Sequence, residues 1–292
     1  MELLKKLKEW NENEFKSMDY FKTKQQRAHE DRFQACKILN NEVSYYAVFD
    51  GHGGLKENHT VDYCTSNLHV LLEKHLSKLK DRGNEKSVKI IIEYCFLYLD
   101  RLAYNKKLNC GCTCCLLLID HKYEKVFIVN LGDSRCICFS PDGTIKYESK
   151  DHTPISEKVR IEATLMATVH SESRKGWESS YLAIPNKGGI RVSRSFGDFQ
   201  FKSTRTENYH PTKGAMSAFP VIDCMKLKKN RIFLLSTDGA FDMNCRMTSQ
   251  ELVDGFFVCT NEETMIKNVE NAVEAVSQRT TDDVTIGIVL IK

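Results

Sequence analysis

Apolar, strand-forming segments that end on an aspartate recur along this chain, and this pattern restricts the fold more than any other feature. The first reads YAVFDGHGG over residues 46–54, where a run typical of a buried strand stops at Asp50. Gly51 lets the backbone turn sharply and bring its carbonyl near a ligand, and His52 can exchange a proton near neutral pH. A carboxylate fixed at a strand end can face a cleft, so this segment by itself suggests a metal or phosphoryl site.

Three further segments repeat this arrangement of a strand and a carboxylate. Asp238 and Asp242 follow the strand at 232–235, Asp133 follows the strand at 126–131, and Asp282 and Asp283 precede the strand at 284–291. Hard divalent cations such as Mg²⁺ and Mn²⁺ bind oxygen ligands, commonly carboxylates with backbone carbonyls and water. Asp-Gly pairs are also ordinary turn chemistry, which would explain any one of these segments. Four of them on strong strands favour a cation site.

The hydrophobic patterning predicts an α+β protein in which antiparallel sheets carry helical pairs on the outside. Strands are expected near 33–39, 43–49, 113–119, 124–131, 135–139, 232–237 and 284–291, and helices near 58–80, 86–104, 156–168, 248–258 and 261–278. Thr248 and Glu251 form a capping-box pattern. No linker, repeat or low-complexity tract interrupts the chain, so we expect one domain over residues 23–292 after an N-terminal helical extension at residues 1–22.

Charge and hydropathy argue against several classes of partner. The formal net charge is +3 and no long Lys/Arg block is present, which argues against a nucleic-acid-binding protein. No apolar stretch approaches the length of a membrane span, and the first residues lack the continuous apolar core of a signal peptide. We therefore expect a cytoplasmic or nuclear protein.

Twelve cysteines raise the question of a metal site or a disulfide framework. The densest cluster, at positions 110, 112, 114 and 115, lacks the C-x₂-C spacing of a zinc knuckle and leads directly into the apolar segment LLLI. Buried free cysteine packs as a small apolar residue, and reduced thiols are the default in the cytosol and nucleus. Core packing is therefore favoured over metal or redox chemistry here.

Seven blocks of residues, taken in order, resemble the metal-dependent Ser/Thr protein phosphatases, the PPM family or type 2C. They are HEDRF at 29–33, VFDGHGG at 48–54, NLGDSR at 130–135, KDHTP at 150–154, VSRSFGDFQFK at 192–202, STDGAFD at 236–242 and DDVTI at 282–286. A single short block would be weak, but seven in order are specific. The resemblance implies a four-layer α-β-β-α sandwich, phosphorylated protein substrates and, we expect, a monomer.

The resemblance also assigns roles to individual residues. Asp50 would bridge two Mn²⁺ or Mg²⁺ ions, with the Gly51 carbonyl on one of them; Asp238 and Asp282 would bind one ion, and Glu30 would hold the other, largely through water. Asp133 and Asp242 match positions that some members use for a third, weaker ion, and Asp198 matches an acidic position with a supporting role.

The chemistry implied by the resemblance is hydrolysis of a phosphomonoester by a water that two divalent ions activate. The same ions would offset the charge on the phosphoryl oxygens. The departing serine or threonine oxygen needs a proton, and His52 would supply it as a general acid. The alternative for His52 is a histidine that only stabilises its turn. No covalent intermediate is required, so none of the cysteines needs to be a nucleophile.

Two segments depart from the family pattern. Gln26 stands where the family usually carries a phosphate-binding arginine, and Arg27 is one position further on. Because a shift of one residue along a strand reverses the direction of a side chain, either a bulge lets Arg27 bind the phosphate or another group does so. The second departure runs from Leu165 through the expected flap at 170–191, and it leaves substrate preference open.

Three functions are compatible with these residues. The first is a phosphoserine/phosphothreonine protein phosphatase, which the set of carboxylates favours. The second is a metallophosphatase of small phosphomonoesters, whose metal centre would look the same. The third is a pseudophosphatase that uses the fold as a scaffold; Gln26 favours it, and the retained Asp50, Asp238 and Asp282 argue against it.

Overall fold

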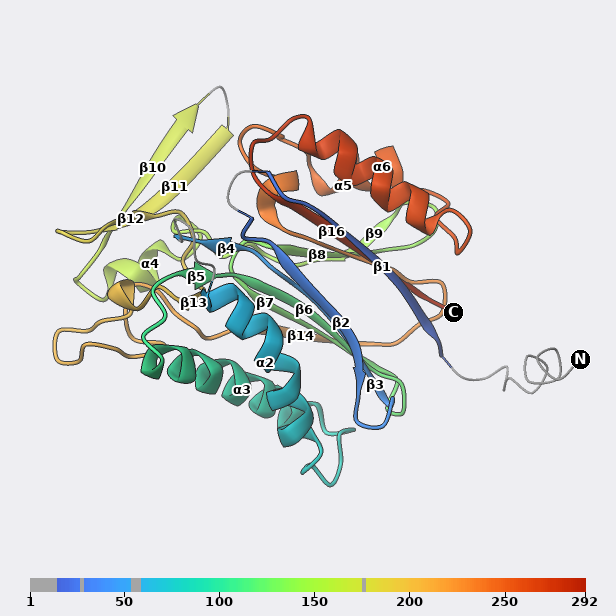
Figure 1. Cartoon of the computed structure of the whole chain (residues 1–292), viewed down its shortest axis with the longest axis horizontal. Coiled ribbons are helices and arrows are strands. Elements are labelled where there is room, and N and C mark those ends of the chain that lie inside the picture. Colours follow the sequence, from blue (N-terminus) through green and yellow to red (C-terminus); the bar gives the residue numbers. More distant parts are fainter. Residues whose placement is uncertain (1–14, 27–28, 54–58, 175–176) are drawn as a thin grey trace, which may run out of the picture.

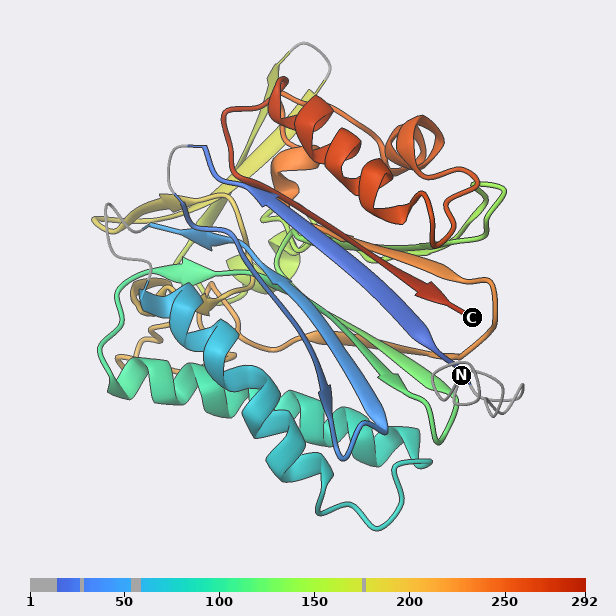
Figure 2. The same ribbon diagram turned by 45° about the vertical axis from the view of Figure 1, so that its right-hand side comes forward.

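Two five-stranded antiparallel sheets pack face to face between two layers of helices (Figures 1 and 2). The structure is a computed structural model that describes residues 15–26, 29–53, 59–174 and 177–292. One sheet has the order β1 (Ser17–Lys24), β16 (Val284–Ile291), β15 (Ile232–Ser236), β8 (Arg135–Phe139) and β9 (Ile145–Glu148). The other has the order β14 (Val221–Lys226), β7 (Lys125–Leu131), β6 (Cys114–Asp120), β3 (Val43–Phe49) and β2 (Arg32–Ile38). The four-layer sandwich expected from the sequence is confirmed.

The central strand β3 shows why the sequence folds into layers. All of its residues are buried, because both faces of its sheet are covered. Successive side chains of a strand point to opposite faces. Tyr45, Ala47 and Phe49 therefore pack into the core under the helices, whereas Tyr46 and Val48 pack into the core between the two sheets. This alternation fixes the register of β3, so Asp50, the residue that follows the strand, lies at one end of the sheet.

Each sheet is covered by one pair of helices (Figure 1). Helices α2 (His59–Leu76) and α3 (Glu85–Asn105) cover the sheet that contains β3, and α5 (Ser249–Phe256) and α6 (Met265–Ser277) cover the other. The Asn84 side chain caps α3 by accepting from the amide of Ser87. Thr248 and Glu251 form the predicted capping box at the start of α5.

Two predicted helices are wrong in the structure. The helix expected at 156–168 ends early: α4 spans only Lys158–Glu162, where Ile161 is its single buried residue, and Leu165 has a positive φ that no helix continues. Of the expected N-terminal helical extension, residues 17–22 belong instead to β1, which pairs with β16. The reason is a period of two: Met18 and Tyr20 pack toward α6, and Phe21 packs between the sheets. Residues 1–14 lie outside the described residues.

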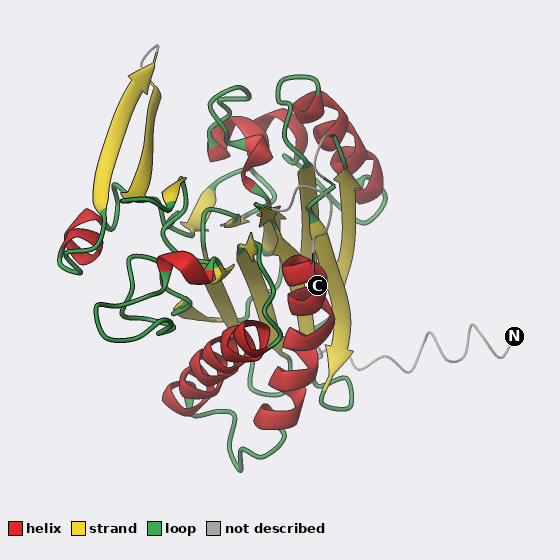
Figure 3. Ribbon diagram, turned by 60° about the vertical axis from the view of Figure 1, so that its left-hand side comes forward, coloured by secondary structure: helices red, strands yellow, loops and turns green. Residues whose placement is uncertain are grey.

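The divergent segment after α4 forms a small sheet of its own. Strands β10 (Thr168–Arg174), β11 (Trp177–Ile184) and β12 (Gly188–Ile190) pair antiparallel. This flap, residues 168–190, projects from one end of the sandwich (Figure 3). The sequence pattern did not reveal these strands, nor β9 and β14.

The cysteines behave as the sequence predicts. Those at 110, 112, 114 and 115 are free and buried, and burial raises the pKa of the Cys112 and Cys114 thiols well above the usual value. These thiols are therefore neutral packing groups. Within the described residues, no helix has both the length and the apolar composition needed to cross a membrane.

Gly287 provides a test of this packing. It lies opposite Phe21 in the β1–β16 ladder, and a Cβ at this position would overlap the Phe21 ring, which stacks on Phe33 and Tyr46. We predict that Gly287→Ala destabilises the protein by about 1–3 kcal/mol, as overpacking does in other cores, when unfolding is followed in urea. Gly255→Ala on α5 is the matched control, because a Cβ there meets no atom; it should be neutral or stabilising. Equal stabilities of the two variants would contradict the prediction.

Candidate metal centre

One cleft, formed where β3, β7 and β15 end and β16 begins, gathers most of the predicted site residues. Its volume is about 660 Å³, and its walls include Glu30, Asp50, Gly51, His52, Asp133, Asp198, Asp238 and Asp282, together with residues 187–192 from the flap and the segment that follows it. Side chains that are up to 252 positions apart (282 minus 30) thus meet in one cavity. Of the other candidates, Asp242 is not in these walls, and Arg27 lies outside the described residues.

The carboxylates in the cleft repel one another. Burial, followed by the nearby charges of Asp238 and Asp31, raises the pKa of Asp50 well above its usual value. Burial and Asp238 also raise the pKa of Asp133, and they raise that of Asp282 to about 7. The pKa of Asp238 itself is raised, again chiefly by burial. A buried set of like charges is unfavourable unless protons or cations offset it.

This set fits hard divalent cations. The walls present carboxylate oxygens, the ligands that Mg²⁺ and Mn²⁺ prefer, and the Gly51 backbone lies among them. In the described part of the chain, no group of three Asp, Glu, His or Cys side chains is arranged to hold an ion as it stands. A cation bound among these carboxylates would offset their repulsion.

Asp283 organises the loop that carries Glu30. Its carboxylate is buried and accepts from the amides of Gln26 (2.5 Å) and Glu30 (2.7 Å). The Glu30 carbonyl accepts in turn from the amide of Gly51, and a Cβ on Gly51 would lie 2.9 Å from that carbonyl oxygen. Glycine at 51 is thus needed for the close approach of this loop to Asp50.

Asp31 is a buried carboxylate that sequence reasoning missed. It accepts 2.8 Å hydrogen bonds from the hydroxyls of Thr237 and Thr285, yet burial and the charges of Asp283 and Asp238 raise its pKa. It therefore adds a further buried carboxyl group next to the cleft walls, and its surroundings disfavour the ionised form. The available signal was its position directly after Glu30 in the HEDRF block.

His52 and Asp198 form a pair on a second, three-stranded sheet. This sheet has the order β13 (Phe196–Gly197), β5 (Gly111–Cys112) and β4 (Gly51–His52). His52 Nε2 lies 2.7 Å from Asp198 Oδ2, which also accepts from Ser195 Oγ at 2.6 Å. Burial alone would lower the pKa of His52, but the Asp198 carboxylate outweighs it and the pKa is raised. Conversely, burial opposes ionisation of Asp198, whereas His52 lowers the pKa of that carboxyl below its usual value.

Gly111 makes room for this pair, and sequence reasoning missed it. A Cβ on Gly111 would overlap both Asp198 Oδ2 and His52 Nε2. The residue stands between Cys110 and Cys112, and no local sequence pattern marks it as part of the site. Only glycine permits the pair to cross β5 at this distance.

Asp242 and Gln26 are committed to structural contacts. The Asp242 carboxylate accepts from the amides of Asn244 and Cys245 and from the Thr280 hydroxyl, at 2.6–2.8 Å, and so caps the turn after β15. The Gln26 side-chain amide donates to the carbonyls of Ser277 (2.9 Å) and Thr280 (3.1 Å). Its two N–H groups are therefore engaged with backbone rather than with the cleft.

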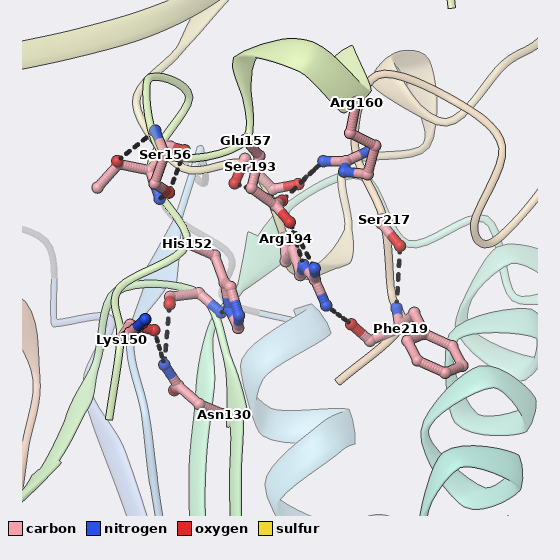
Figure 4. Close-up of polar contacts among 12 residues, drawn as sticks. Asn130, Lys150, His152, Ser156, Glu157, Arg160, Ser193, Arg194, Ser217 and Phe219 are labelled. Carbon is pink, nitrogen blue, oxygen red and sulfur yellow. Dashed lines mark hydrogen bonds and ion pairs between the residues drawn. The ribbon is translucent and has the colours of Figure 1, made fainter. Parts of the chain in front are cut away.

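Arg194, in the VSRSFGDFQFK block, is also committed away from the cleft (Figure 4). Its guanidinium donates twice to the Glu157 carboxylate and once to the carbonyl of Phe219 (2.7 Å). Glu157 also accepts from Arg160 and Ser193. Burial opposes its ionisation, but Arg194 and Arg160 lower its pKa to about 2. The cations in the described cleft walls are Lys187 and Arg191.

The chain is similar in sequence to known proteins. A sequence profile described as protein phosphatase 2C matches residues 11–284. Protein phosphatase 2C homolog 3 of Schizosaccharomyces pombe is 30% identical over 267 residues, which is 87% of this chain and 58% of the relative. The human integrin-linked kinase-associated serine/threonine phosphatase 2C is 29% identical over 237 residues, covering 77% of this chain and 53% of the relative. The chain thus spans little more than half the length of these relatives.

Two solved structures illustrate the shared fold. A phosphatase from a pathogenic strain of Toxoplasma gondii superposes with a TM-score of 0.71 at 21% identity, covering 95% of this chain and 93% of that chain. A sex-determining protein of C. elegans gives a TM-score of 0.70 at 19% identity, covering 93% of this chain and 64% of that one. At these identities the likeness establishes the fold.

Asp238→Asn tests cation binding without an activity assay. Mn²⁺ should raise the melting temperature of the wild-type protein by several °C, since a ligand at a hundredfold excess over its Kd adds about 2.7 kcal/mol and each kcal/mol is worth about 2–4 °C. The variant should melt no lower than the wild type without cations, because a buried like charge is removed, and should lose most of the Mn²⁺ shift.

Asp254→Asn, on the exposed side of α5, is the matched control and should keep the full shift. An undiminished Mn²⁺ shift in Asp238→Asn, followed by differential scanning fluorimetry, would contradict the assignment of this carboxylate to a cation.

Proposed function

Because the chain belongs to the protein phosphatase 2C family, we propose that it is a protein serine/threonine phosphatase that hydrolyses phosphoserine and phosphothreonine without a covalent intermediate. One observation carries the proposal: four carboxylate-bearing segments and the His52–Asp198 pair share a single cleft. The arrangement combines groups that bind divalent cations with a group that can donate a proton, which is what hydrolysis of a phosphomonoester requires.

The proposed cation ligands are the carboxylates in the cleft. Asp50, Gly51, Glu30, Asp238 and Asp282 line the same cleft. We propose that these four carboxylates and the Gly51 carbonyl would hold two Mn²⁺ or Mg²⁺ ions. When bound, the ions would activate a water and offset charge on the phosphoryl oxygens. A third, weaker ion would use Asp133 with Asp242, which would first have to release the turn that it caps.

His52 is proposed as the general acid, and Asp198 as the residue that orients it. The imidazole side chain is 25% exposed, so one face reaches the cleft while Nε2 lies 2.7 Å from Asp198. Asp198 also stabilises the protonated form, and Ser195 fixes the direction of its carboxylate. The leaving serine or threonine oxygen would take the proton from Nδ1 of His52, because Nε2 is bonded to Asp198.

We propose that Arg27 binds the substrate phosphate, together with Lys187 and Arg191 in the cleft walls. The Gln26 side chain donates its hydrogen bonds to backbone carbonyls, and the Arg194 guanidinium donates to the Glu157 carboxylate. Arg191 lines the cleft and uses one guanidinium nitrogen on Ser179 Oγ, which leaves the rest of its fork for an anion. A guanidinium that binds two phosphoryl oxygens would offset the charge that Gln26 cannot.

We also propose that the chain from β1 onward is one phosphatase domain, a few residues longer at its start than the sequence pattern suggested. We further propose that the protein is a monomer in the cytoplasm or nucleus. Its substrates there would be phosphorylated proteins of signalling. The net charge of +3 and the lack of a long basic block support a protein substrate over a nucleic acid.

The proposal is tested by phosphate release from a phosphothreonine peptide. We predict turnover with Mn²⁺ or Mg²⁺, none with chelator or in Asp50→Asn, and no radiolabel retained on the protein after rapid denaturation. Hydrolysis of small phosphomonoesters alone would favour the metallophosphatase alternative. Tight binding of a phosphoprotein with no turnover in fresh Mn²⁺ would favour the scaffold alternative.

The role of His52 has a more specific test. His52→Gln should lower kcat on the phosphothreonine peptide by about 10²–10⁴-fold, the usual contribution of a general acid. The loss on an aryl phosphate should be far smaller, because an aryloxide leaves without a proton. His75→Gln on α2, outside the cleft, is the control and should leave both rates unchanged. Equal losses on the two substrates would argue against proton donation by His52.

A further inference from the structure

An ion pair between Lys202 and Asp100 is buried completely, and the proposed chemistry makes no use of it. Both side chains are 0% exposed, and Lys202 Nζ lies 2.7 Å from Asp100 Oδ1. Removing two charges from water costs several kcal/mol per ion, so a buried pair is often no more stabilising than apolar residues of the same size. Such a pair calls for an explanation other than stability.

The pair is attached to the segment that carries Asp198. Asp100 accepts from the amide of Gly197 (2.9 Å) and from the Tyr209 hydroxyl (2.8 Å). Lys202 Nζ donates a second hydrogen bond to the carbonyl of Ser195 (2.8 Å). Both charged groups therefore hold backbone atoms within three residues of Asp198.

Helix α3 supplies a rigid base for these contacts. Asp100 lies in the interior of α3, and Phe96, one turn earlier on the same face, stacks on Phe196 of β13 with ring centroids 5.1 Å apart. The segment thus meets α3 through one apolar and one charged contact. These contacts determine where β13 lies against β5, and hence where Asp198 meets His52.

The backbone at Asp198 needs such support. Asp198 has φ 51° and ψ 38°, in the left-handed region, and its side chain makes no cap hydrogen bond to the short helix that it precedes. A residue that is not glycine persists in this conformation only where its surroundings enforce it. The anchored atoms at Ser195 and Gly197 provide that enforcement.

We propose that Asp100 and Lys202 are positioning residues: by fixing residues 195–197 they aim the Asp198 carboxylate at His52 and so set the geometry of the proton donor. The inference rests on the proposed function, because it concerns the same acid. Its physical content is separate from catalysis, since the hydrogen bond from His52 to Asp198 can be observed without turnover.

The main test replaces both charges by apolar groups, in Asp100→Leu with Lys202→Met. Because no unpaired charge is left buried, the double variant should fold. We expect kcat on the phosphothreonine peptide to fall at least tenfold with KM nearly unchanged, and the aryl phosphate rate to fall less. Tyr209→Phe, which removes a single hydrogen bond to Asp100, should shift the same ratio in the same direction by a smaller factor.

A matched control comes from the ion pair of Arg82 and Asp120, which are joined at 2.7 Å and largely buried. Asp120 lies opposite Val43 at the start of β3, so it is at the far end of that strand from Asp50. Arg82→Met with Asp120→Leu should change stability while leaving the ratio of peptide to aryl phosphate rates at the wild-type value.

A spectroscopic readout separates failure of this inference from failure of the proposed function. The ring N–H of His52 that bonds to Asp198 should give a proton NMR resonance that disappears in His52→Gln and in Asp198→Asn. In the double variant at 100 and 202, and to a smaller degree in Tyr209→Phe, it should shift or broaden, and in the control it should not. An unaltered resonance and rate ratio in both test variants would overturn the inference, whether or not the wild type proves to be a phosphatase.

Discussion

Repulsion among buried carboxylates at one end of the sandwich is the constraint that the rest of the structure has to offset. Asp50, Asp133, Asp238 and Asp282 come from separate strand ends, and burial with mutual charge raises the pKa of each carboxyl. Such a cluster persists only because β3, β15 and β16 are held by two covered sheets whose cores are independent of it. The fold thus provides the stability that the cleft lacks.

The residues around the cluster reduce the cost by hydrogen bonding to carboxylates that lie just behind it. Asp283 accepts hydrogen bonds from the amides of Gln26 and Glu30, and Asp31 accepts hydrogen bonds from the hydroxyls of Thr237 and Thr285. These bonds join the N-terminal loop to the start of β16. Gln26 at the family's arginine position belongs to this set of contacts, because its side chain ties the same loop to the end of α6. The Gln26 side chain thus anchors the loop, but it is neutral and brings no positive charge to a substrate phosphate.

Most strands of the two large sheets, the helical pairs and the carboxylates in the cleft could be predicted from the sequence, because each depends on a local pattern. Strand β3 has a continuous apolar run that ends at Asp50, and α5 has its capping box. Contacts made across the fold left no such pattern. Gly111 is needed because a Cβ there would overlap His52 and Asp198. Nothing in the sequence distinguishes Asp100 from the other acidic residues of α3, because Lys202 contacts it only in the folded protein. The helix expected at 156–168 is short because Ile161 is the single buried residue of α4, and Leu165, at a positive φ, is exposed.

Carboxyl groups are buried both in the cleft and elsewhere in the interior, but the charges of their neighbours differ between the two. Outside the cleft, Asp100 meets Lys202, Asp120 meets Arg82, and Glu157 meets two arginines. Within it, Asp50 and Asp238 meet other carboxylates. Selection for stability alone would favour apolar residues at both kinds of position. The unpaired set is therefore best explained by a positively charged ligand, and the paired residues near Asp198 by the need to hold one side chain still beside it.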